Sequence, residues 1–265
     1  MLPGSKGIFF SKMTRALFAT AVVIILTLIT LPFPLIAVEL KSNIICRDNV
    51  PAIHREQLAN KLRKITGWTD LRFDEAGVLR GGGVASSGGS AKAREFVLGA
   101  MRGRAVVVIE DASKSPEVVF CRVNPARWKS EGETRPPAFV VQIDFADFEH
   151  VMGDEQALQA FDEGWALLHE LDHVVNDSSD ATAPGETGEC EDRINQMRRE
   201  CNLPQRASYY YTFSPLTADR VFKTRLVRLA FDQEQTRNKK KRYWVVWDAN
   251  SVGGVNEQKE IASLR

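Results

Sequence analysis

The segment WALLHELDHVVND (residues 165–177) carries two histidines four residues apart, His169 and His173, with Glu170 directly after the first. On an α-helix, residues four apart project from the same face, so both imidazoles can direct a nitrogen at one cation. Zn²⁺ binds well to two imidazoles and one carboxylate, which leaves a fourth position for water. Glu170 is offset from both histidines and can take the proton of that water. The spacing therefore predicts a hydrolytic zinc site with Glu170 as the general base.

The same letters also fit a simpler helix with a solvated acidic face that includes Glu163, Glu170 and Asp172. Against this interpretation, apolar residues surround the motif: Trp165, Leu167, Leu168, Leu171, Val174 and Val175. Histidines on a largely buried helix need partners for their ring nitrogens, and a metal ion supplies them. The metal interpretation is therefore favoured.

A third ligand has to come from outside this motif. The metzincin pattern requires glycine and histidine at positions where this chain has Asn176 and Ser179, so that class is excluded. Asp177 and Asp180 are near in sequence, but both fall where the helix must turn back. Their spacing therefore fits metal ligation poorly.

The next predicted helix, about residues 186–201, offers glutamates as alternatives. Glu186 falls in its first turn, where a carboxylate is already favoured as a cap. Glu189 lies further inside, sixteen residues after His173 (189 − 173), and is better placed to face inward. We expect Glu189 to be the third ligand, with Glu186 as the alternative.

The remaining pattern predicts an α+β fold that positions these residues. Apolar residues at helical spacing predict helices, and β-branched or aromatic runs predict a small sheet before the histidine helix. The predicted helices are 49–66, a segment from Ser90, 154–176, 186–201 and 218–235, and the predicted strands are 104–111, 117–123, 138–145 and a strand within 236–250. A hairpin is expected between the first two strands. The histidine helix is expected to bury Leu158, Phe161, Leu168, Leu171 and Val175.

The N-terminus carries Lys6, Lys12 and Arg15 before an uncharged apolar stretch, residues 16–38. This pattern is typical of an export signal or an N-terminal membrane anchor, and the sequence leaves both open. Either one predicts an exported chain that is periplasmic, membrane-anchored or extracellular. We therefore divide the chain into this segment (1–38), a catalytic domain (39–235) and a basic C-terminal extension with a possible edge strand (236–265).

Export also makes disulfides plausible among the four cysteines, Cys46, Cys121, Cys190 and Cys201. Cys190 and Cys201 would lie about 16 Å apart on one helix and cannot bond to each other. The net charge of +1 gives no global field that would recruit nucleic acid, and none is expected as a partner.

The predicted second helix and its continuation, NQMRRECNLPQRASY, resemble the effector-type zinc metallopeptidases of bacteria, which include peptidase modules of toxins. Their second helix ends in a pattern that this chain matches at Asn195, Arg198, Glu200, Pro204 and Arg206. The likeness covers about residues 85–211 and is specific from residue 168 to 206. Ile194 and Asn202 depart from the pattern.

The resemblance implies a zincin-like domain that hydrolyses peptide bonds of a peptide or protein substrate. It implies zinc ligands His169, His173 and a second-helix glutamate, with Glu170 as base. Arg206 and Tyr209 follow that helix closely enough to stabilise the transition state or to serve structure, and Tyr210 and Tyr211 are further candidates. In zincins an edge strand binds the substrate backbone, and residues 138–145 are the expected strand.

Three functions compete at this point. The leading one is an exported or membrane-anchored zinc metallopeptidase. The second is a non-catalytic envelope protein that binds a partner on a zincin scaffold. The third is a zinc hydrolase of a non-peptide substrate. The presence of Glu170 favours an enzyme, because a scaffold that only binds zinc does not need the base.

Overall fold

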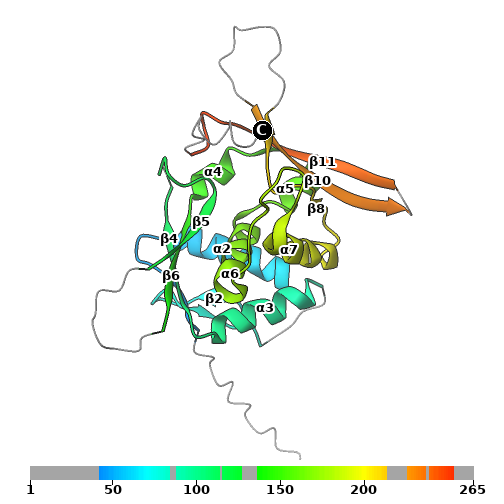
Figure 1. The fold of residues 1–265 in the computed structure, drawn as a ribbon. Helices are drawn as coiled ribbons and strands as arrows, with labels where there is room; N and C mark the ends of the chain where they lie inside the picture. The colour runs from blue at the N-terminus through cyan, green and yellow to red at the C-terminus, as the bar shows by residue number, and fades with distance from the viewer. Residues whose placement is uncertain are drawn as a thin grey trace, which may run out of the picture. The chain divides into compact units, whose positions relative to one another are not determined.

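The computed structural model describes residues 42–83, 88–113, 115–126, 136–213, 226–236 and 239–253. The predicted export segment, residues 1–38, lies outside this range. No helix within the described residues is both long and apolar enough to cross a bilayer. The described chain is an α+β structure with two open sheets, a two-stranded ribbon and several helices (Figure 1).

The first sheet has four strands in the order β1 (Ile44–Cys46), β4 (Val106–Asp111), β6 (Ala138–Ile143) and β5 (Cys121–Pro125). β1, β4 and β6 run parallel, and β5 runs antiparallel to β6. The predicted hairpin between the first two strands is therefore wrong, because β6 lies between β4 and β5. The expectation that residues 138–145 form an edge strand is also wrong. β6 is central, which suits its near-continuous apolar run.

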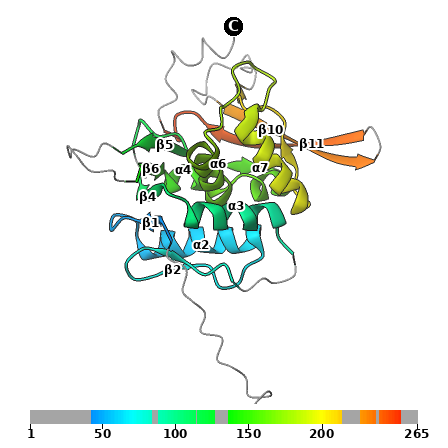
Figure 2. The ribbon, with the colours of Figure 1, turned by 60° about the horizontal axis from the view of Figure 1, so that its bottom comes forward.

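Four helices gather beside this sheet (Figures 1 and 2): α2 (Ala52–Thr66), α3 (Ala91–Arg102), α6 (Glu163–Asn176) and α7 (Gly188–Glu200). α2, α3 and α7 confirm the helices that the sequence predicts in these regions. The apolar side chains of the four helices and those of the sheet form one core, which includes Leu58, Leu62, Met101, Ile109, Ile143, Trp165, Leu168 and Ile194. α6 is therefore anchored by packing on most of its circumference.

The single long helix predicted for residues 154–176 is two helices, α5 (Glu155–Gln159) and α6. Asp162 separates the two helices. Its backbone is extended, and its side chain caps α6 by accepting hydrogen bonds from the Gly164 and Trp165 amides. Leu158 and Phe161 consequently pack against a second core rather than the first. Val175 is 42% exposed and does not belong to the buried face expected for it.

The second sheet is built around a long hairpin of β10 (Leu226–Thr236) and β11 (Lys239–Asp248). The strand β7 (Met152–Gly153) pairs with β11, and β8 (Gln205–Arg206) and β9 (Thr212–Phe213) pair with β10. The helix predicted for 218–235 is wrong over its described part: Val227, Leu229 and Phe231 are buried alternately, which is the period of a strand. The strand predicted within 236–250 is confirmed as β11.

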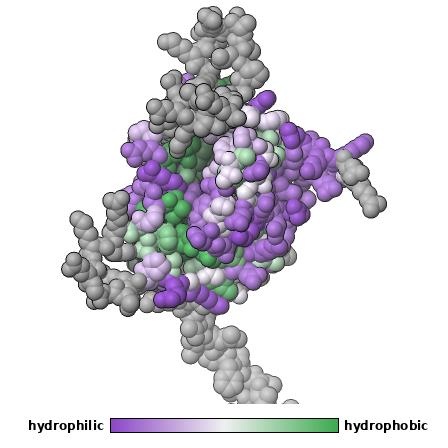
Figure 3. Space-filling model, in the orientation of Figure 1, coloured by the Kyte–Doolittle hydropathy of each residue, from purple (hydrophilic) through white to green (hydrophobic). Residues whose placement is uncertain are grey.

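The second core lies between this sheet and α5, and its buried members include Phe120, Ala157, Val227, Phe231, Val245 and Trp247. Figure 3 shows hydrophobic residues grouped between the first sheet and the helices, whereas hydrophilic residues cover the β10–β11 hairpin. The remaining short elements are α4 (Phe145–Glu149) and the ribbon of β2 (Arg72–Phe73) and β3 (Leu79–Arg80).

All four cysteines lie within the described residues, and each is a free thiol. The structure therefore contains none of the disulfides that export made plausible. Cys46 and Cys190 are buried in the first core instead, where they act as small apolar side chains.

Candidate metal centre

Helix α6 directs His169 and His173 to one point beside its C-terminal half. Their Nε2 atoms lie 3.3 Å apart. The Nδ1 atom of His173 is 2.8 Å from the Ser178 carbonyl oxygen, which can only accept, so this nitrogen carries the proton. The Nδ1 atom of His169 is 3.2 Å from the Glu191 carboxylate and takes the same role. Both Nε2 lone pairs are thereby left to face each other across a small gap.

Asp180 supplies a carboxylate oxygen at that gap. Its Oδ1 is 3.1 Å from the Nε2 of His169 and 3.5 Å from the Nε2 of His173. In a tetrahedron the ligand–ligand distance is about 1.6 times the bond length, so bonds of about 2.0–2.1 Å separate ligands by about 3.3 Å. The three atoms match this spacing.

The hydrogen bonding of Asp180 supports the same conclusion. Its Oδ1 is buried and has no hydrogen-bond partner among the described residues, whereas its Oδ2 accepts from the Tyr209 hydroxyl at 2.8 Å. A buried oxygen without a donor is costly unless a cation is present. His169, His173, Asp180 and Cys190 therefore form a cluster that could hold a metal ion.

Asp180 reaches the histidines because of how the chain leaves α6. Asp177 caps the helix in the left-handed conformation (φ 51°), which aspartate tolerates better than most residues. The chain then turns back through Ser178. Arg193 of α7 holds this turn by bonding to the Ser178 hydroxyl and, at 2.8 Å, to the fully buried Asp172 carboxylate. The sequence prediction that Asp180 only serves the turn missed this geometry.

Neither glutamate expected as the third ligand joins the cluster. α7 begins at Gly188, so Glu189 lies in its first turn instead of further inside the helix. The exposed Glu189 carboxylate bonds to the amide and the hydroxyl of Ser179, both at 3.3 Å. Glu186 precedes the helix and is also exposed. The structure thus places Asp180 where the sequence predicted Glu189.

The glutamate that α7 turns inward is Glu191, which is 1% exposed. Its carboxylate pairs with Arg198, 3% exposed, and with Arg206 at 3.2 Å. Burial raises the pKa of Glu191, but the two guanidinium groups outweigh it and hold that pKa well below its usual range. Glu191 is therefore an anion that orients His169. In the sequence, Glu191 and Arg198 are two helical turns apart, and this spacing could have indicated an ion pair on one face of α7.

The groups around His169 favour a positive charge at its ring. Burial lowers its pKa, but the nearby Asp180 and Glu191 carboxylates and the Cys190 thiol raise it well above the usual range. Cys190 lies 3.2 Å from the Nδ1 of His169 and donates its S–H to the His169 carbonyl oxygen. Burial raises the pKa of this thiol to about 11, so it stays protonated at neutral pH.

Glu170 is 8% exposed and lies against β5. Burial raises its pKa, with opposition from the neighbouring His169 and His173. A hydrogen bond from the Val123 backbone of β5 also lowers it. A desolvated carboxylate with a raised pKa beside metal-ligand atoms is suited to accept a proton.

A cavity of about 560 Å³ opens onto His169 and Glu170. Tyr209 lines it and stacks on His169 with ring centroids 6.0 Å apart, while the guanidinium of Arg206 lies 4.9 Å above the Tyr209 ring. Arg206 also bonds to the Ser208 and Tyr209 carbonyls. The structure thus brings Tyr209 and Arg206 to the site, where they contact the ligand residues.

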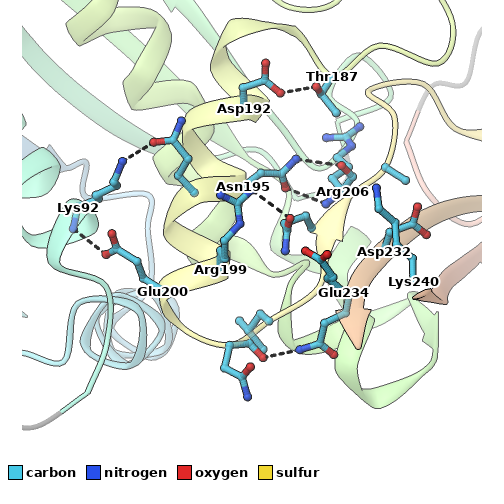
Figure 4. Close-up of a pocket in the computed structure, with 16 residues that line it drawn as sticks. Lys92, Thr187, Asp192, Asn195, Arg199, Glu200, Arg206, Asp232, Glu234 and Lys240 are labelled. Carbon is cyan, nitrogen blue, oxygen red and sulfur yellow. Dashed lines mark hydrogen bonds between the residues drawn. The ribbon is translucent and has the colours of Figure 1, made fainter. Parts of the chain in front are cut away.

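A second hollow of about 780 Å³ lies on the outer face of α7 and is polar (Figure 4). Its side chains bond largely to one another, as Asn195 does to the backbone of Arg206 and Lys92 to Gln196. No metal-ligand cluster lines it among the residues that Figure 4 draws. The chemistry therefore concentrates on the His169 side of α7.

Comparisons of the chain with protein-family models, with curated proteins and with solved structures find no match.

Proposed function

We propose that this protein is a zincin-like zinc peptidase with His169, His173 and Asp180 as ligands and Glu170 as the general base. The observation that carries the proposal is the triangle of two Nε2 atoms and one Oδ1 at 3.1–3.5 Å, with Glu170 beside it. The two Nδ1–H bonds support it, because they hold both histidines in the tautomer that binds metal through Nε2.

The donor set favours Zn²⁺ over other common ions. Two imidazoles and one carboxylate are the ligands of hydrolytic zinc sites, whereas Mg²⁺ and Ca²⁺ select oxygen. Cys190 remains a thiol that donates to a backbone carbonyl, so three ligands and an open fourth position are expected.

Zinc in such a site lowers the pKa of a bound water toward about 7. Glu170 would accept a proton from water and would return it to the leaving amine, and burial of its carboxylate favours the protonated form that this role requires. Asp180 is oriented by the Tyr209 hydroxyl, and His169 is oriented by Glu191. Tyr209 also lines the cavity, and its hydroxyl could bind the developing oxyanion only by releasing its hydrogen bond to Asp180.

A peptide substrate is supported by β5, which has a neighbouring strand on one side only within the described sheet. The Val123 backbone of this strand bonds to Glu170, so β5 lies directly at the base. An extended peptide can add to such an edge through backbone hydrogen bonds. The role expected for residues 138–145 therefore passes to β5 in this proposal.

The apolar segment 16–38 supports action outside the cytoplasm, with the chain exported or tethered to a membrane. The same segment is then the membrane partner, and a peptide or protein is the substrate.

Metal analysis of the purified full chain tests the ligand assignment. We expect one zinc per chain in the wild type and in Glu189→Gln, since Glu189 is exposed and bonds to Ser179. Asp180→Asn should lose most of the zinc at the same chelator concentration. Retention by Asp180→Asn together with loss by Glu189→Gln would reverse the assignment, and a wild type without zinc would reject the metal.

Cleavage of a mixture of peptides tests the activity. Glu170→Gln should keep its zinc and lose about 10²–10⁴-fold in cleavage rate, because it removes the general base. Zinc binding without any Glu170-dependent cleavage would contradict the peptidase and point to the non-catalytic binding protein.

A further inference from the structure

The aromatic part of the cavity beside Glu170 has no role in the chemistry proposed above. Its wall is formed by Val119, Phe120, Phe161, Trp165, Leu229 and Trp247. Trp165, Leu229 and Trp247 are each 2% exposed, so the wall is held by the protein core. Ligand sites typically combine such apolar walls with polar groups, and the rest of this cavity is lined by His169, Glu170, Glu191, Arg198, Arg206 and other mostly polar side chains. The wall is therefore continuous with the proposed reaction centre.

The rings of this wall present both faces and edges. Phe161 and Trp247 have nearly parallel planes, 7° apart, with centroids separated by 6.2 Å. Phe120 stands edge-on to both, at 81° and 86°. Aromatic rings attract one another in offset-stacked and edge-to-face arrangements. This wall consequently suits a further aromatic ring.

The backbone of Phe120, one of the wall residues, has an unusual conformation. Its φ of 61° lies in the left-handed region, which is costly for a bulky residue. The Phe120 amide donates to the Asp147 carboxylate, and its carbonyl accepts from the Asp144 amide, both at 2.9 Å. Strained conformations that partners maintain in this way cluster at ligand sites. Phe120 also directly precedes β5, so the same turn sets the wall and starts the edge strand.

Trp247 provides a second, independent observation, because a polar group of this wall lacks a hydrogen-bond partner. Its indole Nε1 is buried and has no hydrogen-bond partner among the described residues. Buried tryptophan N–H groups normally find an acceptor. This part of the second core is therefore not a fully satisfied interior.

We propose that the cavity binds a large aromatic side chain of the substrate, so that the bond cleaved lies next to an aromatic residue. The inference rests on the proposed peptidase function, which brings a peptide to Glu170. A charged side chain is disfavoured, because it would lose its hydration against rings that return few hydrogen bonds.

Binding can be measured without cleavage by using the zinc-loaded full chain with Glu170→Gln. The probes are end-blocked peptides that differ at one central residue, which is phenylalanine, leucine or alanine. Calorimetry should give a dissociation constant for the phenylalanine peptide at least about tenfold below that of the alanine peptide, from the apolar area buried. Sequencing the products that the wild type releases from a randomised peptide mixture should show aromatic residues beside the cut.

A cavity-filling variant links the preference to this wall. Ala166 of α6 lines the cavity, and Ala166→Leu in the Glu170→Gln background should reduce the phenylalanine-to-alanine ratio severalfold. Ala91→Leu, at an exposed position of α3, is the matched control and should leave the ratio unchanged. Equal binding of the three peptides, or a ratio that Ala166→Leu does not change, would overturn the inference.

The failure of this inference is distinguishable from the failure of the peptidase proposal. Glu170-dependent cleavage without preference for aromatic residues would overturn the inference and leave the peptidase standing. Selective binding of the phenylalanine peptide with no cleavage by the wild type would support the cavity and contradict the peptidase.

Discussion

Glu170 and Glu191 are two buried glutamates near His169, and their surroundings are opposite. Glu191, on α7, has two arginine partners that hold its pKa well below the usual range. Glu170, on α6, has no arginine partner in the described structure, and burial raises its pKa. The same side chain is thus a permanent anion at one position and a proton acceptor at the other. Under the proposed function, this difference distinguishes a group that positions His169 from the general base.

The largest effect on stability is expected for Glu191→Ala. It leaves Arg198, 3% exposed, as a buried cation without its carboxylate partner. Breaking a buried ion pair in this way costs about 3–5 kcal/mol. Urea unfolding of the metal-free full chain should show a loss of this size. A change below about 1 kcal/mol would mean that the two glutamates are not energetically distinct.

Glu170→Gln should behave in the opposite way in the same unfolding experiment. It replaces a desolvated carboxylate that has no arginine or lysine partner among the described residues by a neutral group of nearly the same shape, so we expect the free energy of unfolding to stay within about 1 kcal/mol or to rise. If Glu170 is the general base, this result would fit the common trade of stability for function at active sites. A loss comparable to that of Glu191→Ala would indicate that Glu170 is structural.

Tyr209→Phe tests the role of Asp180, the carboxylate that we propose as the third zinc ligand. The change removes the 2.8 Å hydrogen bond to Asp180 and keeps the ring that stacks on His169. Loss of such an outer-shell partner typically costs about 10–100-fold in metal affinity or activity. Competition with a zinc chelator measures it. Tyr210→Phe is the control, because the Tyr210 hydroxyl donates to the Ala181 carbonyl instead, and equal effects of both would contradict the assignment.

The sequence predicts that His169 and His173 lie together, because they share one helix and their spacing determines their geometry, and both belong to the candidate metal cluster. Asp180 could not be placed, since its position depends on the left-handed turn at Asp177 and on the clamp from Arg193. Glu189 was preferred only because α7 was expected to begin two residues earlier.

The fold shows the same division between local and non-local information. Helices α2, α3 and α7 follow from local periodicity. The order of β4, β5 and β6 depends on which strands meet in space, and chain order does not determine it. The β10 segment carries helix-favouring glutamine and glutamate, yet Val227, Leu229 and Phe231 pack on one face of a strand, so tertiary packing overrides propensity.

The smallest effect on stability is expected for an ion pair on the surface. It provides the reference against which the buried Glu191–Arg198 pair is compared. Asp232 of β10 and Arg242 of β11 bond through both carboxylate oxygens, at 2.7 and 2.9 Å, but the Arg242 side chain is 53% exposed. The hydrogen bond to Arg242 lowers the pKa of Asp232, although burial opposes it. Its stabilising contribution is therefore present above the unfolded pKa of about 3.9 and is lost as pH falls through the lower folded value.

We expect Asp232→Asn to cost at most about 1 kcal/mol at pH 7, and the difference from the wild type should shrink toward zero as the pH falls through the lowered folded pKa of Asp232. Unfolding curves of the two proteins over this pH range provide the measurement. Added salt should reduce the difference at pH 7, since exposed charges are screened. The Glu191–Arg198 pair should respond much less to salt, because both side chains are buried. A salt response of equal size in both pairs would contradict the view that burial, and not geometry, determines how much the Glu191–Arg198 pair stabilises the fold.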